Sequence, residues 1–234
     1  MSGSLALLDG ENLTAEWTLR SAQTHNRRLL KSIDSILREA GWDLDSVDAF
    51  AVAGGPGSFT GLRIGMTTMK VLAWTTRKLY AAVCTLDALA LPLCFSANPV
   101  CTLLDARKGE IYSALYRPDG KAGFRLEAPY AAITPSRLAE SLIRKLSGPA
   151  VFCGDGWTAY RDFLKDRLGE MALEPPSSFH LIRAASIAEL ARRRFAEGRS
   201  EDPKLSAPLY LRPSEAEIHY PDLAKKSSGK PEII

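Results

Sequence analysis

A glycine-rich segment between an apolar strand and a helix constrains this chain more than any other feature. The run Gly54-Gly-Pro-Gly-Ser-Phe-Thr-Gly-Leu-Arg-Ile-Gly65 follows the apolar residues 48–53, and a helix is predicted behind it to about Thr76. Glycine permits positive φ angles and lets a phosphate or another backbone approach closely. The start of a helix offers unpaired N–H groups and the positive end of the helix dipole. The segment therefore predicts either an anion-binding turn or a tight structural turn.

Two common phosphate-binding motifs fail at this segment. The Walker motif needs a Gly-Lys-Ser or Gly-Lys-Thr triplet, and the segment has none. A dinucleotide-binding pattern that began at Gly55 would need glycine where the chain has Thr60. A generic anion-binding turn is left as the functional alternative, and its candidate residues are Gly54, Gly55, Gly57, Ser58 and Thr60.

The helix behind the turn carries small residues along one face. Gly61 and Gly65 are four residues apart, and Thr68 and Leu72 continue the same face. A glycine inside a helix costs about 1 kcal/mol relative to alanine. Close packing would offset this cost. It could be packing against the protein's own sheet or against a helix of a partner, and both alternatives stay open.

Strands alternate with helices along the rest of the chain. An amphipathic helix from about Thr24 carries Leu29, Ile33 and Leu37 on its apolar stripe. In the second half, a β-meander precedes helices near residues 135–146, 160–168 and 186–197. This alternation predicts an α/β protein with two similar lobes. We expect an N-terminal lobe, a C-terminal lobe with a returning helix, and a flexible tail over residues 1–98, 99–215 and 216–234.

A second glycine turn lies in the other lobe. Gly154, Asp155 and Gly156 follow a short apolar strand, and Asp105 ends another strand. Carboxylates at strand ends beside a cleft hold Mg²⁺ and phosphate in nucleotide phosphotransferases. An aspartate at such a junction is more often a turn former. Asp105, Gly154 and Asp155 are therefore candidates for a nucleotide-like site, with the turn-forming role as the alternative.

Composition and charge exclude several classes of protein. Of 234 residues, 46% are hydrophobic and 24% charged, which is typical of a globular chain. The net charge of +3 does not by itself indicate nucleic-acid binding. The run Arg192–Arg194 is interpreted as a solvated helix face, with a patch for tRNA or an acidic partner as the alternative.

Cysteine, histidine and hydropathy patterns complete these exclusions. No apolar run reaches the about 20 residues that a membrane helix needs. We expect a cytoplasmic protein whose four cysteines are mostly buried, reduced thiols. The three histidines form no H-x-x-x-H pair, and no metal site is predicted.

Several segments together carry a family resemblance. Residues 53–65 closely resemble the signature of the TsaB (YeaZ) family of tRNA threonylcarbamoyladenosine biosynthesis proteins. Matching segments follow in the family's order: Asp105-Ala-Arg-Lys-Gly-Glu-Ile-Tyr112, Gly154-Asp-Gly-Trp157 and Pro208-Leu-Tyr-Leu-Arg212. The resemblance spans residues 5–215 and implies an actin-like, two-lobed fold of the sugar kinase and Hsp70 class.

The resemblance also implies a role and a set of partners. The family supports the placement of threonylcarbamoyl on the adenosine next to the tRNA anticodon, but the catalyst is its relative TsaD. We therefore expect no enzyme activity from this chain alone. The implied partners are TsaD, the ATPase TsaE, a second copy when TsaD is absent, and tRNA mainly through the complex. No cofactor is certain, although ATP or ADP at the complex interface is compatible with the resemblance. The implied partner contact is formed by Leu29, Ile33, Leu37, Gly61, Ile64, Gly65, Thr68 and Leu72.

One departure from the family pattern concerns the first strand. Family members begin with a strand of the type ILAIDTS before the segment that matches Ser4–Gly10, and this sequence does not contain it. We expect a misassigned start codon or a truncated chain. The middle strand of the first lobe would then be absent from this sequence.

Two other functions are weighed against the scaffold hypothesis. An actin-fold small-molecule kinase would use Asp105 and the two glycine turns, but no carboxylate stands out as a base for a substrate hydroxyl. A metalloprotease would need a cluster of His and Glu ligands, and the sequence lacks one.

Overall fold

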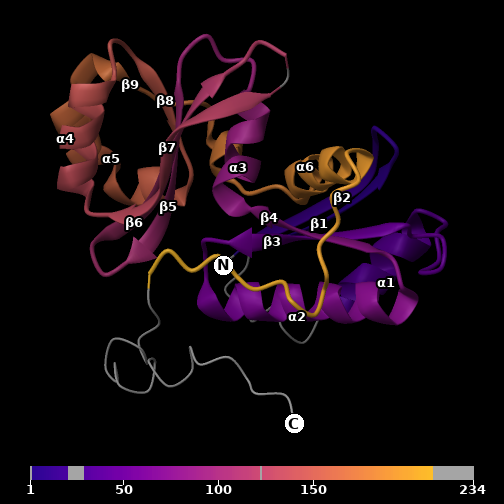
Figure 1. Cartoon of the computed structure of the whole chain (residues 1–234). Helices are drawn as coiled ribbons and strands as arrows, with labels where there is room; N and C mark the ends of the chain where they lie inside the picture. The colour runs from indigo at the N-terminus through magenta and orange to yellow at the C-terminus, as the bar shows by residue number, and fades with distance from the viewer. Residues whose placement is uncertain (1, 21–28, 122, 213–234) are drawn as a thin grey trace.

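The computed structural model describes residues 2–20, 29–121 and 123–212. Figure 1 shows two groups of strands, each covered by helices. The C-terminal group is a five-stranded sheet in the order β7-β6-β5-β8-β9. Strands β5, β6 and β7 form an antiparallel meander, and β5, β8 and β9 are parallel. These strands are β5 (Val100–Arg107), β6 (Glu110–Pro118), β7 (Phe124–Ile133), β8 (Ala150–Cys153) and β9 (Ala172–Leu173).

Two helices and two short 3₁₀ turns complete the second lobe. They are α4 (Pro135–Lys145), α5 (Asp155–Leu168), η3 (Gly169–Met171) and η4 (Ser177–His180). α4 carries proline in its first turn, where the missing N–H costs nothing, and basic residues in its last turn. Trp157 of α5 is fully buried and stacks on Phe152 of β8, with 5.1 Å between the ring centroids. The core of this lobe therefore lies between the sheet and the two helices.

The first lobe contains two separate strand pairs. β1 (Ser2–Asp9) pairs antiparallel with β2 (Asn12–Arg20), and β3 (Ala49–Gly55) pairs parallel with β4 (Leu79–Cys84). No strand among the described residues joins β1 to β3.

Helix α6 (Ala184–Ala196) bridges the two strand pairs. Its first N–H groups are capped by β1 and β2, because Ala184 N donates to Ser4 Oγ (3.0 Å) and Ala185 N donates to Glu16 Oε1 (3.0 Å). Further along, Ile187 and Ala191 pack on the buried side chains of β4. α6 thus holds the two pairs as one layer.

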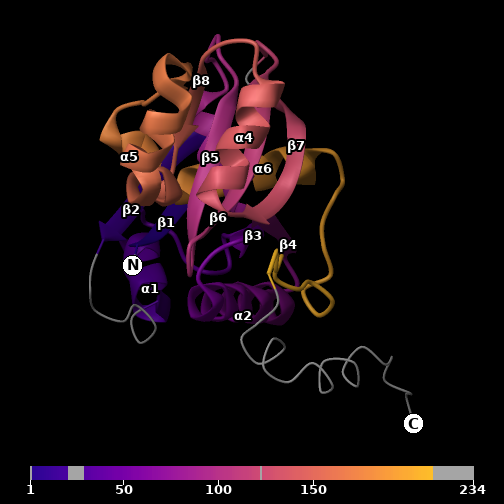
Figure 2. The same cartoon turned by 90° about the vertical axis from the view of Figure 1, so that its left-hand side faces the viewer.

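The other helices of the first lobe are α1 (Leu29–Glu39), α2 (Phe59–Thr76), α3 (Thr85–Ala90) and the short η2 (Leu91–Leu93). α1 and α2 lie on the face of the strands opposite α6 (Figures 1 and 2). The expected start of the first helix at Thr24 lies outside the described residues. α2 begins at the N-cap Ser58, whose Oγ accepts from Gly61 N, and ends at Arg77 in the left-handed conformation.

The last described segment, residues 199–212, is called the C-terminal arm here. It runs back from α6 over β4 and α2 (Figure 2). Glu201 N donates to Tyr80 O at 2.9 Å, and the Glu201 carboxylate accepts from Ala82 N at 3.1 Å. The arm therefore satisfies backbone groups of β4 that a neighbouring strand would otherwise pair.

The four cysteines are free thiols. Cys94, Cys101 and Cys153 are buried, as the sequence predicts, whereas Cys84 is half-buried. Burial raises the pKa of the Cys101 thiol to about 12.

Candidate functional site

The first glycine turn lies directly against the C-terminal arm. Gly55 has φ +109°, and Leu209 N donates to Gly54 O at 2.7 Å. A Cβ at Gly55 would lie 2.7 Å from Leu209 O, which is closer than real Cβ contacts. The backbone that comes close to this glycine is therefore the chain's own arm.

The polar residues of the first turn lie at the start of α2. Ser58 uses its hydroxyl to cap the helix, and Thr60, two residues later, is exposed. Gly57 does not have a positive φ, and a Cβ there would meet only Leu62 at 3.9 Å. The N-terminus of α2 keeps the dipole that favours an anion. Anion binding by Gly54, Gly55, Gly57, Ser58 and Thr60 stays a prediction.

The second turn brings two predicted residues together. Asp105 N donates to Asp155 Oδ1 at 3.0 Å. Asp105 also accepts from Arg107 N at 2.8 Å and pairs with the Arg107 guanidinium at 3.0 Å. A Cβ at Gly154 would overlap Leu103 O. These contacts favour the turn-forming role of the two aspartates, and a nucleotide-binding role stays a prediction.

Sequence reasoning missed His180 at this turn. Gly154 N donates to His180 Nδ1 at 3.1 Å, and His180 Nε2 lies 3.6 Å from Glu174 Oε1. Burial lowers the pKa of His180 below its usual 6.5, because the charged ring would lose water. His180 is 26 residues from Gly154. No local pattern could have paired them.

The residues predicted to form the partner contact on α2 do not all lie on the surface, because some of them face the protein's own sheet. Gly61 is exposed, and a Cβ there would meet only Ser58 at 3.5 Å. A Cβ at Gly65 would touch Val52 Cγ2 of β3 at 3.5 Å. Leu72 packs against the core around Phe50. Gly65 and Leu72 therefore face the protein's own strands more than Gly61 does.

On α1, the structure corrects one predicted contact residue. Leu37 is 7% exposed and belongs to the core, so its side chain is not on the surface. An apolar residue on an amphipathic helix can face either the core or a partner, and Leu37 faces the core. Leu29 and Ile33, like Ile64 and Thr68 of α2, are half-buried.

Comparisons with known proteins decide the family. The family model described as "TsaD: tRNA N6-adenosine threonylcarbamoyltransferase" matches residues 19–220. The chain is 32% identical to the tRNA threonylcarbamoyladenosine biosynthesis protein TsaB of Escherichia coli, and the match covers 89% of both proteins. It is 26% identical to TsaB of Bacillus subtilis over 92% of both. The chain belongs to the TsaB (YeaZ) family. It is therefore involved in tRNA threonylcarbamoyladenosine biosynthesis.

The fold agrees with this family. The solved structure of YeaZ from Pseudomonas aeruginosa aligns with a TM-score of 0.77 and 29% identity, over 90% of this chain and 94% of that one. A second solved structure from the same organism, described as similar to peptidase YEAZ, aligns with a TM-score of 0.76 and 27% identity. The predicted actin-like, two-lobed fold is thus confirmed.

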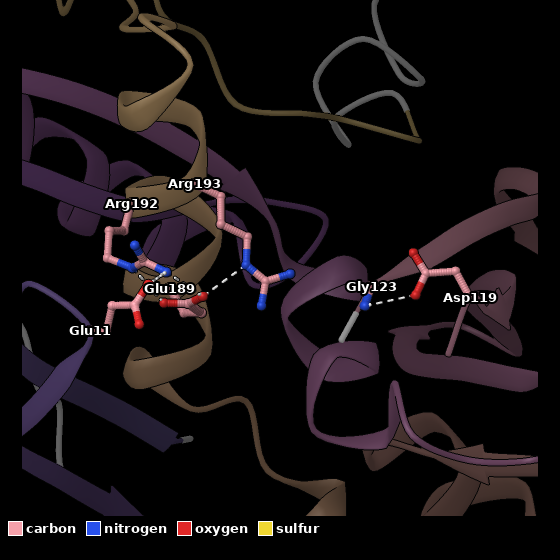
Figure 3. Close-up of polar contacts among 6 residues, drawn as sticks. All are labelled: Glu11, Asp119, Gly123, Glu189, Arg192 and Arg193. Carbon is pink, nitrogen blue, oxygen red and sulfur yellow. Dashed lines mark hydrogen bonds and ion pairs between the residues drawn. The ribbon is translucent and has the colours of Figure 1, made fainter. Parts of the chain in front are cut away.

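The run Arg192–Arg194 makes contacts within this TsaB-family chain. The sequence had left a solvated face or a patch for tRNA or an acidic partner as its alternatives. Arg192 bonds Glu189 at 2.8 Å and pairs with Glu11 at 3.3 Å, and Arg193 bonds Glu189 at 2.7 Å (Figure 3). Arg194 donates to Ala82 O at 2.8 Å. Arg192 and Arg194 thus connect α6 to Glu11 and to β4, whereas the bonds to Glu189 lie within the helix, so the run is not simply a solvated face. Figure 3 also shows Asp119 accepting from Gly123 N in the β6–β7 turn.

The described part of this TsaB-family chain has neither a metal-binding cluster nor a membrane-spanning helix. Residues 2–20, 29–121 and 123–212 contain no group of three His, Cys, Asp or Glu side chains placed to hold a metal ion. Within the same ranges, no helix is both long and apolar enough to cross a membrane.

Proposed function

We propose that this chain is a non-catalytic subunit of the complex that transfers threonylcarbamoyl to the adenosine next to the tRNA anticodon. In this proposal it binds and supports the catalytic subunit TsaD. The match to TsaB proteins over about nine-tenths of the chain carries the proposal. The chain itself performs no transfer.

The face formed by α1 and α2 is the proposed contact with TsaD. Both helices lie on one side of the first lobe (Figures 1 and 2). Gly61 lies exposed on α2, where the lack of a side chain permits close approach of a second helix. Leu30 of α1 is 62% exposed and adds apolar area. Close approach and apolar area are the two features that helix packing needs.

The remaining partners follow from the same proposal. Without TsaD, the same face joins two copies of this chain. The ATPase TsaE is the third protein of the complex, and ATP or ADP binds where the subunits meet. The tRNA is held mainly by the assembled complex rather than by this chain alone.

A substitution at Gly61 tests the proposed contact. We expect Gly61→Leu to abolish the complex with TsaD of the same organism, because the added bulk projects from an exposed position of α2. The substitution raises helix propensity, so the fold should be retained. Gly148→Leu is the matched control, since nothing lies within 4 Å of a Cβ there. The measurement is size-exclusion chromatography with light scattering, alone and with TsaD.

The outcomes separate the alternatives. A mixed peak for the wild-type chain and Gly148→Leu, but not for Gly61→Leu, supports the proposal. A complex that tolerates Gly61→Leu overturns the contact face. No complex from a folded wild-type chain overturns the scaffold role, and phosphoryl transfer by the chain alone would then favour the kinase alternative. Gly65→Leu is a poorer test, because its side chain would press on Val52 of β3.

A further inference from the structure

A group of basic side chains lies in the second lobe, where β6, β7 and α4 meet. Arg117 lies near the end of β6, Arg125 near the start of β7, and Lys145 is the last residue of α4. All three are exposed, and together they are called the basic corner here. The proposed contact with TsaD lies on α1 and α2 of the other lobe (Figure 1). The basic corner is therefore a separate surface.

One carboxylate, that of Glu127 on β7, contacts the two arginines of the basic corner. Arg117 Nε donates to Glu127 Oε1 at 2.6 Å, and Arg125 Nη2 lies 3.4 Å from the same oxygen. Lys145 Nζ donates to the backbone oxygen of Glu127. The hydrogen bond from Arg117 holds the pKa of the Glu127 carboxyl below its usual value, so this group is charged at neutral pH. Three cations around one carboxylate leave a local excess of positive charge.

The two arginines of the basic corner are directly opposite each other on neighbouring strands. Arg117 of β6 is the register partner of Arg125 of β7. Opposite residues of an antiparallel pair have Cβ atoms about 4.5–5.5 Å apart, and like charges at such positions destabilise the sheet. An acidic residue at either position would be more favourable for folding alone. Residues that conflict with a local stability rule are expected at functional sites, so this pair indicates an anion from outside the chain.

The chain's own carboxylates do not neutralise this excess. Asp119, two residues after Arg117, accepts from Lys121 N at 2.8 Å and from Gly123 N at 3.0 Å within the β6–β7 turn. Within residues 2–20, 29–121 and 123–212, Arg117 and Arg125 form ion pairs with Glu127 alone. Arg125 is 76% exposed in its side chain. The basic corner therefore presents its positive charge to solvent.

We propose that the basic corner binds phosphate groups of an RNA backbone. A guanidinium fork matches the oxygens of a phosphate, and the Lys145 ammonium group adds a point charge beside it. An acidic protein segment fits less well, because protein interfaces centre on apolar and aromatic side chains. Leu126, the exposed apolar residue next to Arg125, points to the other face of the sheet, since side chains alternate along a strand.

The proposal rests on the proposed function in one respect: the RNA is the tRNA on which the complex acts. The test is a fluorescence anisotropy titration of labelled tRNA between about 50 and 200 mM salt. The tRNA is titrated with the complex of this chain and TsaD from the same organism, and with this chain alone. We expect Arg125→Glu and Lys145→Glu each to weaken the affinity at least about fivefold. Each should also lower the slope of log affinity against log salt by about 1, because one phosphate contact is lost.

Two further variants separate a binding role from a structural one. Glu127→Gln removes the negative charge and keeps an amide oxygen that can accept from Arg117. We expect it to strengthen tRNA binding about threefold, because a phosphate about 6 Å away is no longer repelled. A cluster with only a structural role would give no such gain. Arg167→Glu makes the same charge change at an exposed arginine of α5 and should alter the affinity less than about twofold. Thermal melting checks that each variant is folded.

Each outcome bears on the proposal. Weaker binding by the two charge-reversal variants, together with stronger binding by Glu127→Gln, supports it. Unchanged tRNA affinities in a complex that assembles overturn it and leave the proposed function intact, and an equal loss in Arg167→Glu overturns it as a general charge effect. If no complex with TsaD forms, the proposed function fails, and the titrations of the chain alone decide this proposal, which no binding of tRNA also overturns. If the variants weaken the binding of TsaD or TsaE instead, the occupant is a protein and this proposal is wrong.

Discussion

Gly55 and Gly154 share one local conformation and one physical reason for it. Both have φ near +110°, and at both a backbone carbonyl of the chain lies where a Cβ would stand. The sequence predicts that something comes close to these turns, since only glycine leaves that space. It does not predict what comes close. Leu209 and Leu103 are far from the turns in sequence, so long-range packing decides the answer.

Replacing Gly55 should therefore destabilise the fold. We expect Gly55→Ala to lower the free energy of unfolding by about 2–3 kcal/mol, because the methyl group would meet Leu209 O in a left-handed backbone conformation. Gly57→Ala should change it by less than about 0.5 kcal/mol, since a Cβ there has only ordinary contacts. Urea unfolding of both variants measures the difference. Equal stabilities would contradict the close approach of the arm.

His180 makes the second turn sensitive to pH. Burial lowers its pKa in the folded chain, opposed by Glu174 and assisted by Arg161. The unfolded chain then binds more protons between the lowered pKa and the usual 6.5, so this contribution to stability is complete above pH 6.5 and declines as the pH falls below it. In His180→Asn, an amide oxygen can still accept from Gly154 N without titrating. The pH dependence of the free energy of unfolding, measured by thermal melts between pH 7.5 and 5, gives the number of protons taken up on unfolding. We expect this number to be lower in His180→Asn than in the wild-type chain, by less than one proton.

At the scale of elements, the two lobes differ in how their strands are supported. Strand β5 is buried along most of its length between two neighbours. Gly3–Leu8 of β1 are only half-buried, although Leu5–Leu8 are all apolar. A two-stranded sheet is marginal without further packing. The β1–β2 pair therefore depends on α6.

Hydrogen exchange should report this difference. We expect backbone amides of β1 to exchange about 100-fold faster than those of β5, because local opening of a two-stranded pair exposes less buried surface. Mass spectrometry of peptides from residues 2–20 and 100–118 measures the ratio under one set of conditions. Equal protection of the two segments would mean that the pair opens only with the whole molecule.

Elements with strong local signals could be predicted from the sequence, and those that depend on distant partners could not. Ser58 and the glycines around it mark the start of α2. The meander β5–β7 follows from alternating strands and turns. The two-residue strand β9 has no signal of its own, because it exists only by pairing with β8. Leu37, which the family resemblance places at the partner contact, lies in the core instead.

At the scale of the whole molecule, the C-terminal arm contacts both lobes, although they are far apart in the sequence. Tyr210 stacks on Phe59, and the Arg63 side chain donates to the Tyr210 hydroxyl at 3.2 Å. Arg212 pairs with Glu110 of the second lobe at 3.4 Å. The family motif around Pro208–Arg212 could be recognised from the sequence, but its contact with the first glycine turn could not. The first glycine turn therefore depends on this arm.

The arm also gives β4 a substitute for a neighbouring strand. Glu201 places one carboxylate oxygen 3.1 Å from Ala82 N and the other 2.8 Å from the Ser206 hydroxyl. Removing this side chain leaves the backbone N–H of Ala82 on β4 without its acceptor, which costs about 1–3 kcal/mol. We expect Glu201→Ala to lower the free energy of unfolding by that amount. Because the arm then holds the first turn less firmly, proteolysis within residues 199–212 should also become faster.

Glu197 offers the matched control for this prediction. Its carboxylate is exposed and pairs with Arg199, and an exposed ion pair contributes little to stability. Glu197→Ala should therefore unfold within about 0.5 kcal/mol of the wild-type chain. Urea titration and limited proteolysis of the two variants make the comparison. If both behave like the wild-type chain, the contact of Glu201 with β4 does not contribute to the stability of the fold.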